Sequence, residues 1–329
     1  MFTFISRGVL GFGCSGWRKF IDSQWHCAGI LPGFLDVDVL RPAVAELGLM
    51  FPSAQGFHDG SDPRRGRYLG DEFAGIDCFP FASTEVSLLA VHDSLISLAR
   101  TLLGGDEVRL SSAEAWAKFA GAAGYEQDLH RDYLNHTVLV PNDAVGCRQV
   151  EMFVYLVDVP EDLGPPHLVS RTHTARAAAA PNWFPRKDFT GSAVEGEESR
   201  FRGAGRPEWY EHEVSAAGPA GTVVAFEVGT FHRGTGMTRV GGARYTMHLA
   251  YRPVHAEWGQ RQAWAARSHE PAWYRFVERA GPRQLELFGF PPRGHPFWTA
   301  DALAGLALRY PGLDLTPWRS RTDTDIAQE

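Results

Sequence analysis

The sequence has few lysines and no cluster of basic residues. Lysine occurs only at positions 19, 118 and 187, and the arginines are scattered along the chain. The 39 acidic residues outnumber the 32 basic residues, which gives a formal net charge of -7. Proteins that bind the nucleic-acid backbone usually carry a basic patch, so we exclude nucleic acid as the expected partner.

Cysteine is scarce as well, and long apolar runs are missing. Cys14, Cys27, Cys78 and Cys147 form no C-x-x-C pair, which argues against a disulfide framework and against a thiolate zinc site. The opening segment "MFTFISRGVLGFGCSGW" is interrupted by glycines, and no stretch has the 18 or so apolar residues of a membrane span. We therefore expect a cytoplasmic protein without a signal peptide or membrane span. The oligomeric state stays open.

The chain does contain enough apolar residues for a large core, since 44% of its 329 residues are hydrophobic. The N-terminal part, about residues 1–105, is predicted to be helical. Its helices should run from Asp36 or Asp38 to about Leu49 and from about Thr84 to Leu103. Residues 52–75 are rich in turn formers and charge, which predicts a surface loop.

The middle part, about residues 106–253, changes to short β-branched and aromatic segments separated by glycine and proline. Many short strands without crossover helices are typical of a sandwich or jelly roll. The part from about 254 to 329 returns to helical patterning, so we predict a single mainly β domain with flanking helices. Residues 174–208 have no clear period and are predicted to be a lid or a disordered segment. The predicted strands are "EVRLSSAEAWAKFAG", "HTVLVP", "RQVEMFVYLVDVP", "PPHLVS", "YEHEVS", "GTVVAFEVG" and "ARYTMHLAYRP".

The segment "LHRDYLNH" carries the first candidate site. If this segment is a strand, His130 and Asp132 project from one face, because side chains two residues apart share a face. One histidine and one carboxylate are two of the three ligands of a facial triad, which binds iron and leaves positions open for other ligands. His232, at the end of "GTVVAFEVGTFH", is the candidate third ligand.

A cationic anchor is predicted beside this site. After His232 the chain turns through glycines and enters "ARYTMHLAYRP", so a hairpin returns Arg244 and Thr246 towards the metal. A guanidinium can hold a carboxylate by two charge-assisted hydrogen bonds, with the threonine hydroxyl assisting.

These motifs, in this order, resemble the phytanoyl-CoA dioxygenase family of Fe(II)/2-oxoglutarate-dependent oxygenases. "LHRDY" is similar to its H-x-D motif, and "VYLVDVPEDLGPPHLVSRTHT" is similar to its strand and acidic turn. "AGTVVAFEVGTFHRGTGMTRVGGARYTMHLAYRP" resembles its distal histidine and arginine segment, and "ILPGFLD" its beginning. The resemblance covers residues 28–253 in blocks. It departs at "SRTH", where the family has "PGSH", so the role of His173 stays open.

The resemblance implies a double-stranded β-helix, a cupin-like jelly roll. It implies Fe(II) on His130, Asp132 and His232, and 2-oxoglutarate with its distal carboxylate on Arg244, with O2 as the other cosubstrate. The implied reaction hydroxylates an unactivated C–H bond and releases succinate and CO2. Because Asp132 is a carboxylate where halogenating relatives have a small residue, hydroxylation is favoured over halogenation. Desaturation, cyclisation and epimerisation use the same metal ligands and stay open.

Further residues are candidates by their place in the pattern. Trp116, Phe153 and Gln127 are predicted to contact the cosubstrate. A second set is predicted to contact the substrate or to support the metal ligands. This set comprises Glu114, Tyr133, His136, His173 and His248. The substrate is expected to be a small metabolite or natural-product intermediate, because no compact basic cluster offers a site for the phosphates of an acyl-CoA.

Three other protein classes are alternatives to this interpretation. "HRD" occurs in the kinase catalytic loop, but the asparagine required five residues after the aspartate is Thr137 here. A cupin-type isomerase would begin its site with an H-x-H pair, which this segment lacks. A non-catalytic jelly-roll binding protein is the third, although such a protein is expected to have lost at least one of His130, Asp132, His232 and Arg244.

Overall fold

Two antiparallel sheets form the centre of the molecule. The computed structural model describes residues 28–105, 107–132, 136, 149–175, 177, 183–184, 186, 205–259 and 261–319. One sheet has the strand order β1-β9-β5-β11-β3-β2 and the other β7-β4-β10-β6-β8. The strands are β1 Ala28–Leu31, β2 Asp77–Cys78, β3 Val108–Phe119, β4 Leu129–His130, β5 Val150–Tyr155, β6 His167–Val169, β7 Trp183–Phe184, β8 Glu213–Ser215, β9 Val223–Glu227, β10 His232–Arg233 and β11 Ala243–Pro253.

From β3 to β6 and again from β8 to β11, successive strands alternate between the two sheets. Neighbours within a sheet are therefore far apart in the sequence. The longest pairing joins β3 to β11 and continues from β11 to β5. In the other sheet, β10 lies between β4 and β6. This arrangement brings the chain segment around residue 130 next to the segment around residue 232.

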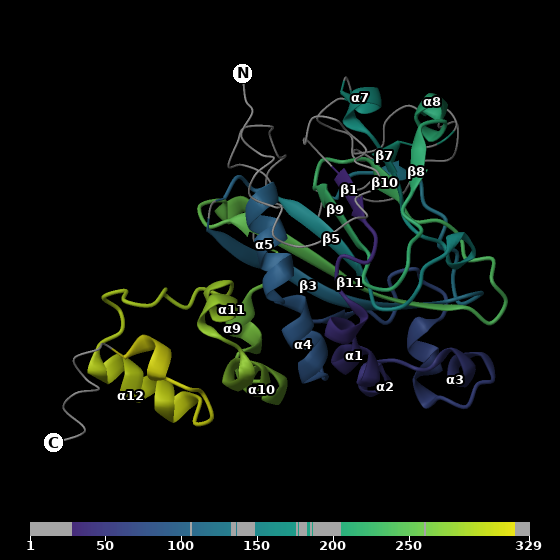
Figure 1. Ribbon diagram of the computed structural model, residues 1–329. Coiled ribbons are helices and arrows are strands. Elements are labelled where there is room, and N and C mark those ends of the chain that lie inside the picture. The colour runs from purple at the N-terminus through teal and green to yellow at the C-terminus, as the bar shows by residue number, and fades with distance from the viewer. Residues whose placement is uncertain are drawn as a thin grey trace.

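Helices cover the outer face of the six-stranded sheet. Figure 1 shows α1, α4 and α10 on the side of β3 and β11 away from the five-stranded sheet, while α7 and α8 lie beyond that second sheet. The α-helices are α1 Val37–Ala45, α2 Leu47–Met50, α3 Ala54–His58, α4 Thr84–Ala90, α5 Asp93–Leu102, α7 Arg171–Thr174, α8 Pro207–Tyr210, α9 Trp264–Arg267, α10 Pro271–Arg279, α11 Pro282–Glu286 and α12 Ala300–Arg309. Short 3-10 helices span Pro63–Tyr68 (η1), Glu161–Leu163 (η2), Glu257–Gly259 (η4) and Thr316–Trp318 (η5).

Two of the three hydrophobic clusters among the described residues hold these layers together. The larger cluster joins the six-stranded sheet to helices that precede the long strands in the sequence and to helices that follow them. Phe79, Met247 and Phe276 are among its buried members. The smaller one joins the two sheets through residues such as Tyr155 and Leu168. Burial of apolar surface of this kind is the main favourable contribution to folding. Within the described ranges, no helix combines the length and the apolar character that crossing a membrane requires.

The predicted N-terminal helices exist but are shorter than expected. The helix predicted to end at about Leu49 is divided at Glu46 into α1 and α2. The helix predicted over 84–103 is divided into α4 and α5, because His92 caps a new helix by accepting a hydrogen bond from the Ser94 amide.

The surface loop predicted for residues 52–75 is wrong in part. It contains α3, capped by Ser53, and η1, capped by Asp62 with a proline at its first turn. The turn formers in this segment therefore act as helix caps.

The predicted β strands are largely observed. The strands expected from "EVRLSSAEAWAKFAG", "RQVEMFVYLVDVP", "PPHLVS", "YEHEVS", "GTVVAFEVG" and "ARYTMHLAYRP" correspond to β3, β5, β6, β8, β9 and β11. The strand expected for "HTVLVP" lies outside the described residues, apart from His136. Within the segment 174–208, the described residues include the short strand β7 and the start of α8.

Candidate metal centre

His130 and His232 meet across neighbouring strands. His232 of β10 lies directly opposite His130 of β4 in the antiparallel register, and the two ring centroids are 4.6 Å apart. Both residues are buried, with 7% and 4% of their surface exposed. Sheet pairing therefore brings together two histidines that are distant in the sequence.

Hydrogen bonds fix which nitrogen of each ring faces the centre. The Nδ1 of His130 lies 2.8 Å from the carbonyl oxygen of Asp128, and the Nδ1 of His232 lies 3.0 Å from that of Thr230. A carbonyl oxygen can only accept, so each Nδ1 carries the proton and donates it. Each ring therefore turns its Nε2 towards the centre, and Nε2 is an atom that metal-bound histidine commonly presents.

Asp132 completes the group from a turn. One carboxylate oxygen lies 3.6 Å from the Nε2 of His130, and the other lies 3.1 Å from the Nε2 of His232. One ligand atom from each of the three residues lies within 4.8 Å of the other two. Two imidazole nitrogens and one carboxylate oxygen match the facial set that binds iron and leaves further positions open.

The route by which Asp132 reaches the site differs from the prediction. We expected His130 and Asp132 to share a strand face, but β4 ends at His130. Asp132 lies just beyond the strand, and its backbone amide donates to the carbonyl oxygen of Val228, 3.3 Å away. A hydrogen-bonded turn, and not strand alternation, directs this carboxylate towards the histidines.

The charges of the three groups depend on one another. Burial, together with the nearby His232, lowers the pKa of His130 to about 4. Burial alone would raise the pKa of Asp132, but the surrounding histidines lower it well below its ordinary value. Burial would likewise lower the pKa of His232, but Asp132 raises it. The carboxylate is therefore ionised and His130 is neutral near pH 7, which are the forms that bind a metal ion.

A cavity of about 790 Å³ opens from these three residues. Its volume lies in the range of small-molecule sites. Its lining mixes charged, aromatic and polar side chains from both sheets. Beyond the three candidate ligands, the lining residues are Glu72, Phe73, Ile76, Glu114, Trp116, Lys118, Glu126, Gln127, Asp128, Arg131, His136, Glu151, Phe153, Tyr155, Pro166, Arg186, Tyr210, Gly234, Arg244, Thr246, His248 and Arg261.

Arg244 and Thr246 line this cavity from β11, and both are buried. The guanidinium of Arg244 donates to the carbonyl oxygen of Leu163 at 3.3 Å. The hydroxyl of Thr246 lies 3.1 Å from the Nε2 of His248. The structure thus places the predicted cationic anchor in the same cavity as the candidate metal ligands.

Three stacked rings form part of the wall. His248 stacks on Trp116 at a centroid distance of 4.3 Å, and it packs against Phe153 on the other side at 4.1 Å. Phe153 also lies 6.0 Å from the ring of His232. Burial lowers the pKa of His248 well below its ordinary value, and nearby cations lower it further, so this ring is neutral. The stack joins the candidate metal ligands to the strand that carries Arg244.

Gln127 has a structural contact as well as a place in the cavity wall. Its side-chain oxygen accepts a hydrogen bond of 2.7 Å from the amide of Gly234, two residues after His232. A side chain at Gly234 would place its Cβ 2.8 Å from that same oxygen, so glycine permits the close approach. This hydrogen bond of Gln127 therefore connects the segment that precedes β4 to the segment that follows β10.

Glu114 and His136 also line the cavity, and each has a partner. Glu114 accepts a hydrogen bond from the Nε1 of Trp116 at 3.1 Å and pairs with Arg261 at 3.0 Å. The Nδ1 of His136 lies 3.1 Å from a carboxylate oxygen of Glu151. Burial lowers the pKa of His136, but Asp132 and Glu151 raise it above its ordinary value.

The structure corrects the expected position of His173. This residue lies on α7, is exposed, and stacks on His212 at a centroid distance of 3.7 Å. It does not line the cavity. The departure from the "PGSH" pattern coincides with a short helix, which directs this histidine elsewhere. Tyr133, the other residue in this set, lies outside the described residues.

Several lining residues were missed by the sequence analysis. Lys118, Glu151 and Tyr155 lie on the same long strands as predicted residues, and Arg261 follows β11. The sequence contained a signal that could have identified Lys118 as a cavity residue, because Lys118 shares a strand face with Glu114 and Trp116 and lysine is rare in this chain. The sequence contained no such signal for Arg261, because a residue in a loop has no periodicity that indicates the direction of its side chain.

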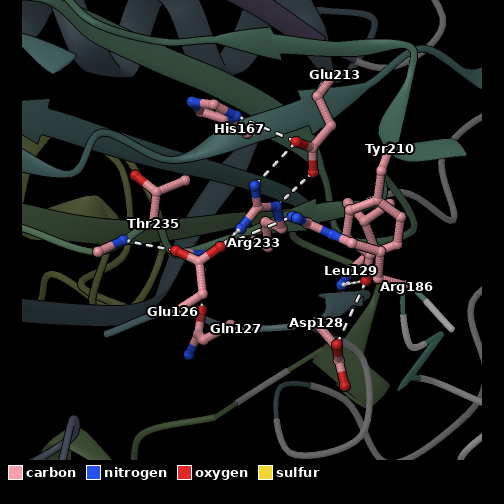
Figure 2. A network of polar contacts seen from close by, with 12 residues as sticks. Glu126, Gln127, Asp128, Leu129, His167, Arg186, Tyr210, Glu213, Arg233 and Thr235 are labelled. Atoms are coloured by element: carbon pink, nitrogen blue, oxygen red, sulfur yellow. Dashed lines mark hydrogen bonds and ion pairs between the residues drawn. The ribbon is translucent and has the colours of Figure 1, made fainter. Parts of the chain in front are cut away.

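A polar network supports the strands next to the cavity, as Figure 2 shows. Arg233 follows His232 and donates to Glu213 and Glu126. His167 lies 3.2 Å from Glu213. The hydroxyl of Tyr210 accepts from the amide of Leu129 at 2.9 Å. These contacts anchor β4 and β10 on both sides of the candidate metal ligands.

Comparison with solved structures finds matches of low similarity. The epimerase SnoN, in complex with Fe3+, alpha ketoglutarate and nogalamycin RO, is 19% identical with a TM-score of 0.44, and the match covers 69% of this chain and 78% of SnoN. HygX from Streptomyces hygroscopicus, with nickel and 2-oxoglutarate bound, is 19% identical with a TM-score of 0.45, over 69% and 83%. EctD from S. alaskensis, with 2-oxoglutarate and 5-hydroxyectoine, is 18% identical with a TM-score of 0.47, over 72% and 76%. No protein-family model and no curated protein matches the chain. At these values, the similarity alone assigns no function to this chain.

Proposed function

We propose that this protein is a non-haem Fe(II)/2-oxoglutarate-dependent oxygenase that acts on a small molecule. One observation carries the proposal: a buried His-Asp-His group and a buried arginine line the same cavity. The first can hold a divalent metal ion, and the second can hold a carboxylate. A cosubstrate that carries both a metal-chelating end and a distal carboxylate fits this pair of features.

The three candidate ligands fit iron on chemical grounds. His130 and His232 present their Nε2 atoms, and Asp132 is an ionised carboxylate between them. Neutral imidazole and carboxylate together suit Fe(II) and other first-row divalent ions. When bound there, Fe(II) with 2-oxoglutarate would supply the oxidative decarboxylation that activates O2 and releases succinate and CO2.

The remaining residues would orient the cosubstrate. Arg244 would hold its distal carboxylate, with the hydroxyl of Thr246 as an assisting donor. Phe153 and Trp116 would pack against its carbon chain, because both line the wall between β5, β11 and β3. A buried site of this kind strengthens the electrostatic hold on both ends of the molecule.

We propose hydroxylation of an unactivated C–H bond as the reaction. Asp132 retains the carboxylate as a third ligand, which supports hydroxylation over halogenation. Desaturation, cyclisation and epimerisation would use the same ligands, and analysis of the product separates these outcomes. Glu114 and Arg261 line the cavity as an ion pair and are candidates for contact with the substrate.

The finer assignments are proposals of the same kind. The alternation of strands between two antiparallel sheets supports a double-stranded β-helix. The order of the motifs supports membership of the phytanoyl-CoA dioxygenase family. We further propose a single domain over residues 1–329 and a cytoplasmic location.

The test is a coupled assay of the purified protein with Fe(II), 2-oxoglutarate and a panel of small metabolites. We expect succinate formation that requires both Fe(II) and O2, and that increases when the panel includes the substrate. The variant Asp132→Ala should form no succinate under the same conditions. If the wild-type protein binds metal but forms no succinate with O2, the catalytic proposal is wrong and a non-catalytic binding protein becomes the better account.

A further inference from the structure

Lys118 lies beside Arg244 in the cavity wall. The antiparallel register of β3 and β11 places Lys118 directly opposite Arg244. Side chains of directly opposite residues project from the same face of a sheet, and both of these line the cavity. Both residues are also buried, with 6% and 7% of their surface exposed. Two cationic side chains are therefore held close together away from bulk water.

The immediate contacts of the two cations are neutral. The Nζ of Lys118 lies 5.0 Å from the ring centroid of Trp116 and 4.8 Å from that of Tyr125. Arg244 donates to the carbonyl oxygen of Leu163. Over the described residues, neither Lys118 nor Arg244 has a carboxylate within ion-pair distance. Two buried cations without a paired anion are costly, and this cost falls when an anion binds between them.

The other ionisable groups around Lys118 do not supply that anion fully. Glu72, in the turn before β2, acts on Lys118 at longer range, and burial raises the pKa of Glu72. Tyr125, after β3, has a pKa raised by burial, so its hydroxyl is neutral. His248, from β11, is neutral, as described above. Burial and the nearby Arg244 lower the pKa of Lys118, Glu72 raises it by less, and the net result is a pKa of about 7.

We propose that Lys118 is a second cationic anchor, beside Arg244, for the distal carboxylate of a 2-oxo dicarboxylic acid, and that it takes up a proton when this anion binds. The proposal rests on the proposed function, because it assumes that the cavity binds such a cosubstrate. It adds a residue that the sequence motifs do not include, and it gives the cavity a preference for dicarboxylates over 2-oxo acids that lack the distal carboxylate.

The direction of the pH dependence follows from linkage. In the empty cavity Lys118 loses its proton as the pH rises through about 7. A bound carboxylate favours the charged form and raises the pKa of Lys118, so binding above pH 7 requires proton uptake. The affinity for the dicarboxylate should then fall by up to about tenfold per pH unit above pH 7. Below pH 7 Lys118 is already charged, and this dependence should flatten.

The experiment is calorimetric titration of 2-oxoglutarate into the protein loaded with Ni(II), which binds the same ligand types and does not consume the cosubstrate with O2. Repeating the titration at pH 8 in buffers of different ionisation enthalpy gives the number of protons taken up. We expect nearly one proton for the wild type. Lys118→Met should bind 2-oxoglutarate on the order of tenfold more weakly at pH 7 and should lose the uptake.

Two further variants make the test specific. Lys118→Arg should retain most of the affinity but lose the proton uptake, because a guanidinium stays charged throughout. Arg239→Met removes a cation that is exposed and paired with Asp162, and it should match the wild type in both readouts. Circular dichroism and Ni(II) affinity show whether each variant is folded with an intact metal site.

The outcomes separate the two proposals. If the Ni(II)-loaded wild type does not bind 2-oxoglutarate, the proposed function is wrong. The proposed role of Lys118 is then wrong as well, because it depends on that function. If the wild type binds and Lys118→Met or Lys118→Arg shows the same affinity and the same proton uptake, the role of Lys118 is wrong and the proposed function stands. If Lys118→Met fails to fold, the comparison of Lys118→Arg with the wild type still decides the question of proton uptake.

Discussion

The two charged regions of the cavity differ in how their charges are balanced. In the metal region, the carboxylate of Asp132 lies between His130 and His232, so negative and potentially positive groups are in contact. In the cation region, Arg244 and Lys118 lie side by side, and none of the described carboxylates is in ion-pair contact with them. The first region presents imidazole nitrogens and a carboxylate to a metal cation, and the second presents cationic groups to an anion. A dicarboxylate that also chelates a metal satisfies both.

The same two regions also differ in how they are built. The metal region depends on the two-residue strands β4 and β10, which contacts of Tyr210 and Arg233 anchor. It also depends on a turn, in which the Asp132 amide donates a hydrogen bond. The cation region lies on β3 and β11, which pair along their whole length. We therefore expect substitutions in the metal region to affect the cosubstrate through the metal, and substitutions in the cation region to affect the cosubstrate alone.

The largest effect is expected from Asp132→Ala. Removing the only carboxylate of the group should weaken Ni(II) or Fe(II) binding by roughly 100-fold or more, because loss of a group that merely supports a ligand already costs about 10- to 100-fold. Competition with a chromogenic chelator measures this affinity. Asp162→Ala, which removes an exposed carboxylate, is the matched control. Equal metal affinity in Asp132→Ala and wild type would show that the metal region is wrongly assigned.

Arg244→Met should produce the second largest effect. Loss of a buried guanidinium should weaken 2-oxoglutarate binding on the order of 100-fold, because a charged carboxylate would lose its main partner. Metal affinity should stay unchanged, which distinguishes the two regions. Titration of 2-oxoglutarate into Ni(II)-loaded protein gives the first value, and the chelator assay gives the second. If Arg244→Met weakened metal binding but kept its affinity for 2-oxoglutarate, the assignment of Arg244 to the cosubstrate would be wrong.

Thr246→Val should have a smaller effect on the same ligand. The substitution removes one buried hydroxyl, whose hydrogen bond to a carboxylate contributes about 1 kcal/mol, or roughly fivefold in affinity. The same titration measures it, with Thr101→Val on the exposed face of α5 as a control. Affinity equal to that of the wild type would exclude this hydroxyl from the carboxylate site.

The smallest effect should lie outside the cavity. His167 lies 3.2 Å from Glu213 and 2.8 Å from Glu161, and its hydrogen bond to Glu213 contributes most to raising its pKa. A raised pKa stabilises the folded state fully below the unfolded value of about 6.5, and this stabilisation is lost as the pH rises through the higher folded value. His167→Asn should therefore lower the free energy of unfolding by about 1 kcal/mol at pH 5.5, and by less at pH 8.

Urea unfolding at the two pH values measures this difference. His269→Asn changes an exposed histidine and serves as the control. A difference that grows with pH would contradict the assignment of the charged form to His167. Unchanged 2-oxoglutarate affinity in His167→Asn would show that this polar network affects the stability of the protein and not the binding of the cosubstrate.

The sequence could predict those parts of the site that lie on long regular strands. The "ARYTMHLAYRP" segment has the alternation of a half-buried strand, and Arg244 and Thr246 line the cavity from it as expected. Local pattern could not predict how Asp132 is directed, because β4 ends two residues earlier and a turn takes over. The helix divisions at Glu46 and His92 depend on single capping contacts, which periodicity does not report.

Other features depended on tertiary contacts. His173 follows the motif order but lies on α7, where it stacks on His212 outside the cavity. Lys118 shares a face with predicted residues, yet its importance appears only when the β3 and β11 register places it opposite Arg244. Pattern gives the face of a strand, whereas the partner across the sheet comes only from the fold.

The most direct test of the central claim is the visible spectrum of the protein under anaerobic conditions. We predict that adding 2-oxoglutarate to the Fe(II)-loaded wild type produces the charge-transfer band of the chelate. Asp132→Ala and Arg244→Met should show little or no band at the same concentrations. A wild-type protein that binds Fe(II) but gives no band at saturating 2-oxoglutarate would contradict the claim that one cavity holds the metal ion and 2-oxoglutarate together.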